Sequence, residues 1–143
     1  MRRWIRRVRV GATLLMLGGC HEDGVVSQKQ VAGGAPERGE RAILVYGCGS
    51  CHVIPGVAAA DGRVGPPLTD FADRTFIAGR IGNEQVGLMR WIRDPRSVDS
   101  LTAMPDLAVS EADARDIAAY LYTLTADRPG PPSPLSGRLI PSH

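Results

Sequence analysis

Residues 48–52 read Cys-Gly-Ser-Cys-His, and this short stretch decides how the rest of the chain is interpreted. Two thiols three residues apart can bond to the two vinyl groups on one edge of a porphyrin. The next residue, His52, then falls under the ring with its imidazole directed at the iron. The motif therefore predicts one covalently attached haem c, with Cys48 and Cys51 as its thioether links and His52 as an iron ligand.

Three other uses of this cysteine pair remain open from the residues alone. A zinc site needs four ligands, and the only further Cys and His residues are Cys20, His21 and His143, which lie near the chain ends. A thioredoxin-like dithiol requires a strand before the first cysteine, which the pattern does not offer. A structural disulfide suits an exported protein but leaves His52 without a role.

A second iron ligand is predicted in Ala103-Met104-Pro105, which lies in a loop before the last expected helix. The Met104 thioether can reach the ring face opposite the histidine. Met1 and Met16 belong to the expected presequence, and Met89 falls on a helix face, where methionine commonly fills gaps in the core. A His/Met pair fills both axial positions and raises the reduction potential, which favours electron transfer over oxygen or peroxide chemistry.

Gly65-Pro66-Pro67-Leu68 follows the cysteine motif closely and reads by itself as a turn. A ligating histidine needs a partner for its second ring nitrogen, and a backbone carbonyl often serves. We therefore predict that the Pro66 carbonyl accepts a hydrogen bond from His52, and that Leu68 packs on the haem ring.

Trp91 has two open interpretations. Its indole N–H, with the neighbouring Arg90, Arg93 and Arg96, could donate to the haem propionates. Alternatively Trp91 is a core residue and the arginines are solvated, which is the interpretation we favour for most of the arginines.

Hydrophobic spacing predicts three helices separated by long loops over 53–75 and 94–109. The first covers 36–46, with Gly39, Ile43 and Tyr46 on one face. The second covers 83–93, with Asn83 as N-cap, Pro95 as its end, and an apolar side made by Val86, Met89 or Leu88, and Ile92.

The third helix follows the N-cap Ser110 and has a negative charge, Asp113, in its first turn. Its apolar stripe consists of Ala114, Ile117, Ala118, Leu121 and Thr125. The outline is all-α, and long loops in so small a domain need something on which to pack.

The N-terminus reads as an export signal over residues 1–19. Five arginines precede the uncharged run 10–19, which is too short to span a bilayer and suits the h-region of a signal peptide. The run ends in Leu17-Gly18-Gly19-Cys20, which resembles a bacterial lipobox and predicts acylation of Cys20; ordinary cleavage nearby is the alternative. The mature protein would be lipid-anchored on the periplasmic side of a bacterial membrane.

Composition divides the remaining chain into three parts. Residues 20–36 read as a flexible tether, 37–125 as the folded domain, and 126–143 as a proline-rich, disordered tail. The whole chain carries 17 basic and 15 acidic residues, but without the five arginines of residues 1–19 the balance is 12 against 15. The mature protein is therefore mildly acidic, which does not support a nucleic-acid partner.

In order, these features resemble the class I, or mitochondrial-type, cytochromes c over about residues 37–125. The resemblance rests on Gly39 with Ile43 and Tyr46, the cysteine motif, Gly65-Pro66-x-Leu68, Ala103-Met104-Pro105 and Ala119-Tyr120-Leu121. It implies an all-α fold with three to four short helices and long loops around one covalent haem. It also implies that the first and last helices cross, with Tyr120 against Gly39.

A narrower likeness is to the cytochrome c domain of subunit II of bacterial haem–copper oxidases. It is carried by Ala78-Gly79-Arg80, Trp91-Ile92-Arg93-Asp94-Pro95 and Ala103-Met104-Pro105. It implies an electron-transfer protein rather than an enzyme, passing single electrons in a bacterial respiratory chain to or within a terminal oxidase. The alternatives are an electron-transfer subunit of a periplasmic dehydrogenase, or a haem sensor or peroxidase, against which Met104 argues.

Overall fold

Three helices provide most of the regular structure in the computed structural model, which describes residues 29–129. The helices are α1 (Pro36–Val45), α2 (Gln85–Arg93) and α3 (Glu111–Leu121), with single 3-10 turns η1 (Cys48–Ser50), η2 (Phe71–Asp73) and η3 (Pro95–Ser97). Two small antiparallel hairpins pair β1 (Phe76–Ile77) with β2 (Ile81–Gly82) and β3 (Leu124–Thr125) with β4 (Arg128–Pro129). The predicted helical fold is confirmed, and the short hairpins are additions to it.

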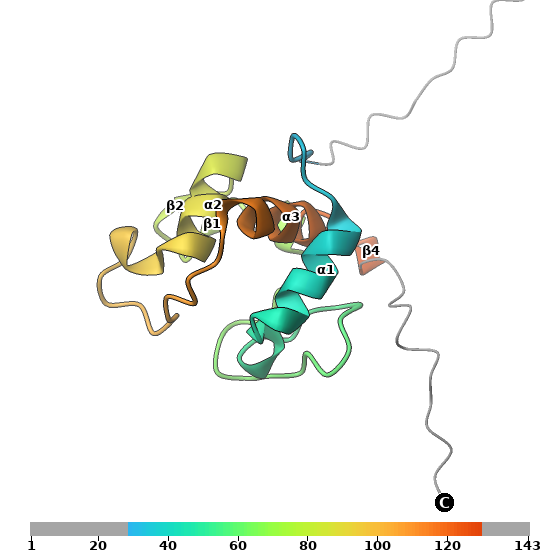
Figure 1. Cartoon of the computed structure of the whole chain (residues 1–143), viewed down its shortest axis with the longest axis horizontal. Coiled ribbons are helices and arrows are strands. Elements are labelled where there is room, and N and C mark those ends of the chain that lie inside the picture. The colour runs from blue at the N-terminus through green and yellow to red at the C-terminus, as the bar shows by residue number, and fades with distance from the viewer. Residues whose placement is uncertain (1–28, 130–143) are drawn as a thin grey trace, which may run out of the picture.

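Helices α1 and α3 cross at close range, as Figure 1 shows. A Cβ atom at Gly39 would lie only 2.1 Å from the Asp116 carbonyl oxygen and 2.9 Å from Tyr120 Cβ. The absence of a side chain at Gly39 therefore lets the two backbones approach. Tyr120 is fully buried at this crossing, and its hydroxyl donates to the Pro55 carbonyl at 2.7 Å. The contact expected between Gly39 and Tyr120 is confirmed.

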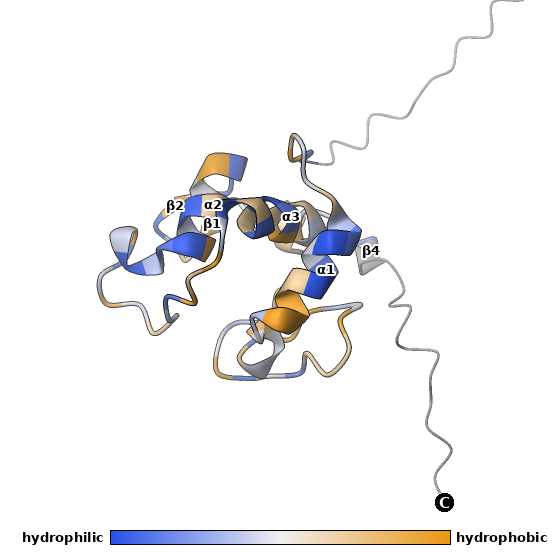
Figure 2. Cartoon of the chain, in the orientation of Figure 1, coloured by the Kyte–Doolittle hydropathy of each residue, from blue (hydrophilic) through white to orange (hydrophobic). Residues whose placement is uncertain are grey.

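The core gathers the apolar sides of all three helices. Figure 2 shows that α1 is hydrophilic in its first turns and apolar in its last, where Ile43 is buried. On α2 the buried residues are Leu88 and Ile92, whereas Val86 is 80% exposed, so its assignment to the apolar side was wrong. On α3 the predicted stripe is buried at Ala114, Ile117, Ala118 and Leu121.

The start of α2 differs from the prediction. Asn83 does not cap the helix, which begins at Gln85 with Glu84 in the N-cap position and no side-chain cap. Instead Asn83 is buried, and its amide nitrogen donates to the carbonyls of Phe71 at 2.8 Å and Arg74 at 3.0 Å. The side chain ties η2 and the turn after it to the base of α2.

The start of α3 agrees with the prediction. The Ser110 hydroxyl accepts from the Asp113 backbone N–H at 3.1 Å, and Tyr46 donates to the Asp113 carboxylate at 2.9 Å. The helix ends at Leu121, so Thr125 belongs to β3 rather than to the helical stripe.

Both ends of the described chain are packed beyond the boundaries expected from composition. Val31 is buried, and the Lys29 ammonium donates to the Arg74 carbonyl and lies 5.4 Å from the Tyr122 ring centre. Residues 126–129 complete the β3–β4 hairpin. The expected signal peptide, Cys20 and residues 130–143 lie outside the described residues. Within residues 29–129, no helix is both long and apolar enough to cross a bilayer.

An ion pair between buried Asp116 and exposed Arg38 joins α3 to the start of α1. The Asp116 carboxylate accepts from Arg38 Nε at 2.6 Å, from Arg38 Nη2 at 2.7 Å and from the Ala35 backbone N–H at 2.8 Å. The hydrogen bonds from Arg38 outweigh burial and hold the pKa of Asp116 below its usual range.

This pair makes the domain sensitive to acid. A carboxylate with a lowered pKa stabilises the fold above its unfolded-state pKa, near 4, and loses that contribution as pH falls through the folded-state value. Asp116→Asn should lower the free energy of unfolding at pH 7 by about 1 kcal/mol, because the Arg38 half of the pair is solvent-exposed. Denaturant unfolding between pH 7 and pH 2 should show the two proteins converging below about pH 4; a constant gap would contradict this.

Candidate haem site

The site residues predicted within the domain all line one cavity of about 390 Å³. They are Cys48, Cys51, His52, Pro66, Leu68, Trp91 and Met104. The remaining walls are largely apolar and come from α1, α2, α3 and the loops between them. The cavity therefore brings together predicted site residues that lie up to 56 positions apart in the sequence, from Cys48 to Met104.

The cysteine motif is presented by a tight turn directly after α1. Gly47, with φ of +67°, reverses the chain, and η1 begins at Cys48. The backbone N–H groups of Cys51 and His52 both donate to the Cys48 carbonyl, at 3.2 and 3.1 Å. Cys48 and Cys51 are not joined to each other by a disulfide, and burial raises the pKa of the Cys48 thiol.

His52 is held by the loop that carries Pro66. Its Nδ1–H donates to the Pro66 carbonyl at 2.7 Å, which is the hydrogen bond expected from the sequence. The bond fixes the tautomer and leaves Nε2 as the ring nitrogen available to a metal. The neighbouring Gly65 is close to the ring, since a Cβ there would lie 2.3 Å from His52 Cε1.

Met104 is the one methionine that lines this cavity. Its backbone N–H donates to the Thr102 hydroxyl at 3.1 Å, which shapes the turn before it. Met89, the other methionine in the described part, is partly buried against the core and does not line the cavity. This placement agrees with the separate roles predicted for the two residues.

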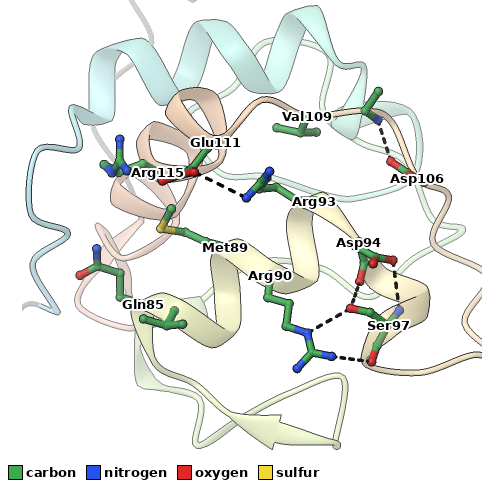
Figure 3. Close-up of a pocket in the computed structure, with 12 residues that line it drawn as sticks. Gln85, Met89, Arg90, Arg93, Asp94, Ser97, Asp106, Val109, Glu111 and Arg115 are labelled. Carbon is green, nitrogen blue, oxygen red and sulfur yellow. Dashed lines mark hydrogen bonds and ion pairs between the residues drawn. The ribbon is translucent and has the colours of Figure 1, made fainter.

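Trp91 is partly buried and lines the cavity, but the arginines around it face elsewhere. Arg90 and Arg93 lie in a second hollow of about 910 Å³ between α2 and the start of α3, which Figure 3 shows. There Arg90 donates to Ser97, and Arg93 lies 3.8 Å from Glu111. Opposite charges are interleaved in this second hollow.

Two charged residues of the cavity, Arg74 and Asp99, were not predicted from the sequence. The Arg74 guanidinium donates to the carbonyls of Pro67 and Thr69 and lies 5.4 Å from the Phe71 ring centre. Asp99 also lines the cavity, and its carboxylate pairs with Arg80. Neither residue belongs to a periodic pattern, so each reads in the sequence as an ordinary solvated charge.

The cavity fits a haem c. Its volume falls within the roughly 300–1,000 Å³ of ligand pockets, and its lining is mainly apolar with a few convergent polar groups. Two thiols and an oriented imidazole lie on its wall in the spacing that attachment needs. Among residues 29–129, no group of three or more His, Cys, Asp and Glu side chains could hold a metal ion, so a zinc site has no ligand set there.

The family model described as "Cytochrome c" matches residues 36–125, well over half of the chain. The chain belongs to the cytochrome c family. It carries electrons by means of a haem c attached through Cys48 and Cys51.

Two curated relatives are cytochrome c oxidase subunits 2. That of Alkalihalophilus pseudofirmus is 38% identical over 78 residues, which cover 54% of this cytochrome and 22% of the relative. That of Bacillus sp. strain PS3 is 39% identical over 59 residues, covering 40% of this chain and 17% of the relative. The cytochrome thus spans only about a fifth of the length of these relatives.

The solved structure of cytochrome c2 from Rhodobacter sphaeroides is similar in fold. It aligns with a TM-score of 0.50 and 22% identity, over 64% of this chain and 97% of that protein. The class I cytochrome c fold predicted from the motif order is therefore confirmed.

Proposed function

We propose that this cytochrome passes single electrons in a bacterial respiratory chain, to or within a terminal oxidase, with His52 and Met104 as the axial ligands. The observation that carries the proposal is the shared cavity. It places the paired thiols, an imidazole fixed by Pro66 and the Met104 thioether around one space. A bound haem supplies a one-electron iron couple at this position.

The residues around the cavity suit electron transfer better than catalysis. Two protein ligands leave no open position for oxygen, peroxide or a substrate. The apolar walls exclude water and keep the surroundings similar in the two oxidation states. A haem sensor or peroxidase would require Met104 to be absent or labile.

The oxidase is proposed as partner because both curated relatives are subunits of that enzyme. The match covers about a fifth of each relative, so this part of the proposal concerns a shared domain only. The lipobox at Cys20 supports a lipid anchor that would keep the cytochrome on the periplasmic side, beside a membrane enzyme. The mature protein should then carry a lipid mass increment, which Cys20→Ser should abolish.

The partner can be tested with respiring membranes that contain or lack this protein. The haem spectrum and oxygen uptake are recorded together. We expect oxidation of the haem to precede oxygen consumption, and the rate of oxygen uptake to be lower in membranes that lack the protein. If the haem is instead reduced by an added periplasmic substrate while oxygen uptake is unchanged, the dehydrogenase alternative is the correct one.

Met104→Ala tests the axial ligand directly. The ferric protein should lose the thioether-to-iron charge-transfer band near the red end of its spectrum. The reduction potential should fall by a sizeable part of the about 0.8 V range that axial ligands span. Absorption spectra and redox titration measure both changes. Met89→Ala is the matched control and should keep the band, since Met89 lies outside the cavity. Survival of the band in Met104→Ala would remove Met104 from this role.

A further inference from the structure

The loop that carries Met104, residues 98–109, is bonded mainly to itself. Leu101 N–H donates to the Asp99 carboxylate at 3.1 Å, Met104 N–H to the Thr102 hydroxyl at 3.1 Å, and Ala108 N–H to the Asp106 carboxylate at 2.8 Å. These are local turns. We call this segment the Met104 loop.

One ion pair joins the Met104 loop to a distant part of the fold. Arg80 Nε donates to the second Asp99 carboxylate oxygen at 3.3 Å. Apart from the backbone bonds by which the loop leaves η3, no other hydrogen bond within residues 29–129 connects the Met104 loop to another element. The loop is therefore fastened to the fold at one polar point.

Arg80 is held in place by the β1–β2 hairpin. It closes the β1–β2 hairpin, where its backbone N–H donates to the Ile77 carbonyl at 2.9 Å. Ile77 is buried in the core, and Ala78 at the hairpin turn lines the haem cavity, as Asp99 does. The ion pair therefore joins two segments of the cavity wall.

Asp99 connects the Arg80 ion pair to the backbone near Met104 through its own hydrogen bonds. One carboxylate oxygen binds Arg80 while the other binds Leu101 N–H, and the Asp99 carbonyl accepts from Thr102 N–H at 3.1 Å. Thr102 in turn holds the Met104 backbone. A short series of hydrogen bonds thus runs from the hairpin to Met104.

We propose that Arg80 and Asp99 form a latch that keeps the Met104 loop closed, and that both act as positioning residues for the iron ligand. This rests on the proposed assignment of Met104. The Arg80 side chain is 57% exposed and that of Asp99 is 20% exposed, so the latch is half-buried and should be modest in strength.

Competition by imidazole for the iron measures the latch. An external ligand must wait for the loop to open, so its apparent affinity scales with the open fraction. In the ferric, full-length holoprotein, added imidazole should displace the Met104 thioether from the iron, and the charge-transfer band should disappear as the titration proceeds. Arg80→Gln and Asp99→Asn should each bind imidazole about twofold to fivefold more tightly than the wild type, the range expected for such a pair.

The double variant Arg80→Gln/Asp99→Asn and one control complete the test. The double variant should bind imidazole no more tightly than either single variant, because the pair is already broken in each. Arg96→Gln is the control. It removes one positive charge, as Arg80→Gln does, but from η3, where the exposed Arg96 side chain makes no hydrogen bond or ion pair with the described residues. Its imidazole affinity should match the wild type.

The outcomes separate a latch from a charge effect. If only the field at the iron mattered, removing a positive and removing a negative charge would change imidazole affinity in opposite directions, and this result would overturn the latch. Unchanged affinity in both single variants would overturn it as well. If the wild type lacks the band, or Met104→Ala retains it, the axial assignment itself fails and the latch has no ligand to hold.

Discussion

Replacing both Cys48 and Cys51 by alanine should yield a protein without covalent haem that no longer holds its three-helix fold. The cavity of about 390 Å³ reaches into the core, where Ile43, Leu88 and Ile117 line it. At about 24 cal/mol per Å³ of unfilled apolar cavity, the cost of leaving it empty is about 9 kcal/mol, an upper figure because water can enter an open cavity. That cost is comparable with the whole stability of a typical domain, about 5–15 kcal/mol.

Mass spectrometry and circular dichroism test this prediction together. The double variant should lack the haem mass, lose most of its helical signal and show no cooperative thermal transition. Each single variant keeps one thioether link and should lie between the two extremes. Ser50→Ala is the matched control between the cysteines, because its exposed hydroxyl donates only within the turn, to the Gly47 carbonyl at 2.7 Å and more distantly to Cys51 Sγ at 3.8 Å. A double variant with native helix content and cooperative unfolding would contradict the argument.

The features that could be predicted from the sequence were those set by short local patterns, such as the cysteine motif and the start of the last helix. Two thiols and a histidine at fixed spacing specify a cofactor, and a serine before a run with helical periodicity specifies a helix start. The cavity then brings Pro66 and Met104 to the cysteine motif, as the order of motifs implied. These features depend on chemistry within a few residues, or on one cofactor that many segments must contact.

What could not be predicted depended on partners remote in the chain. Asn83 has the residue type of a helix cap, but buried carbonyls from Phe71 and Arg74 provide a better use for its amide. The pairing of Arg80 with Asp99 is equally invisible, since nothing in either segment marks the other. The β-hairpins have two-residue strands, which are too short to show any alternation.

The crossing of α1 and α3 is where a single added side chain should do most harm to stability. Gly39 lies against the backbone of α3, not against a movable side chain: its nearest neighbour is the Asp116 carbonyl oxygen. A helix backbone cannot yield locally without losing its own hydrogen bonds. The same crossing positions Ile43 and Ile117, which both line the haem cavity. Displacing α1 would therefore disturb the cavity as well as the core.

We expect Gly39→Val to lower the free energy of unfolding by about 3 kcal/mol or more, at the upper end of overpacking effects. Replacing glycine by alanine in a helix gains only about 0.5–1 kcal/mol in propensity, and β-branched valine gains less, so this opposite effect is too small to compensate. Gly79→Ala provides a matched control, because Gly79 has a φ of +65° but no atom within 4 Å of an added Cβ. Its cost should be about 1–2 kcal/mol, from backbone strain alone. Denaturant unfolding of both holoproteins measures the difference. Equal destabilisation would mean that α1 can shift freely on α3, and that the close contact at Gly39 does not fix the crossing.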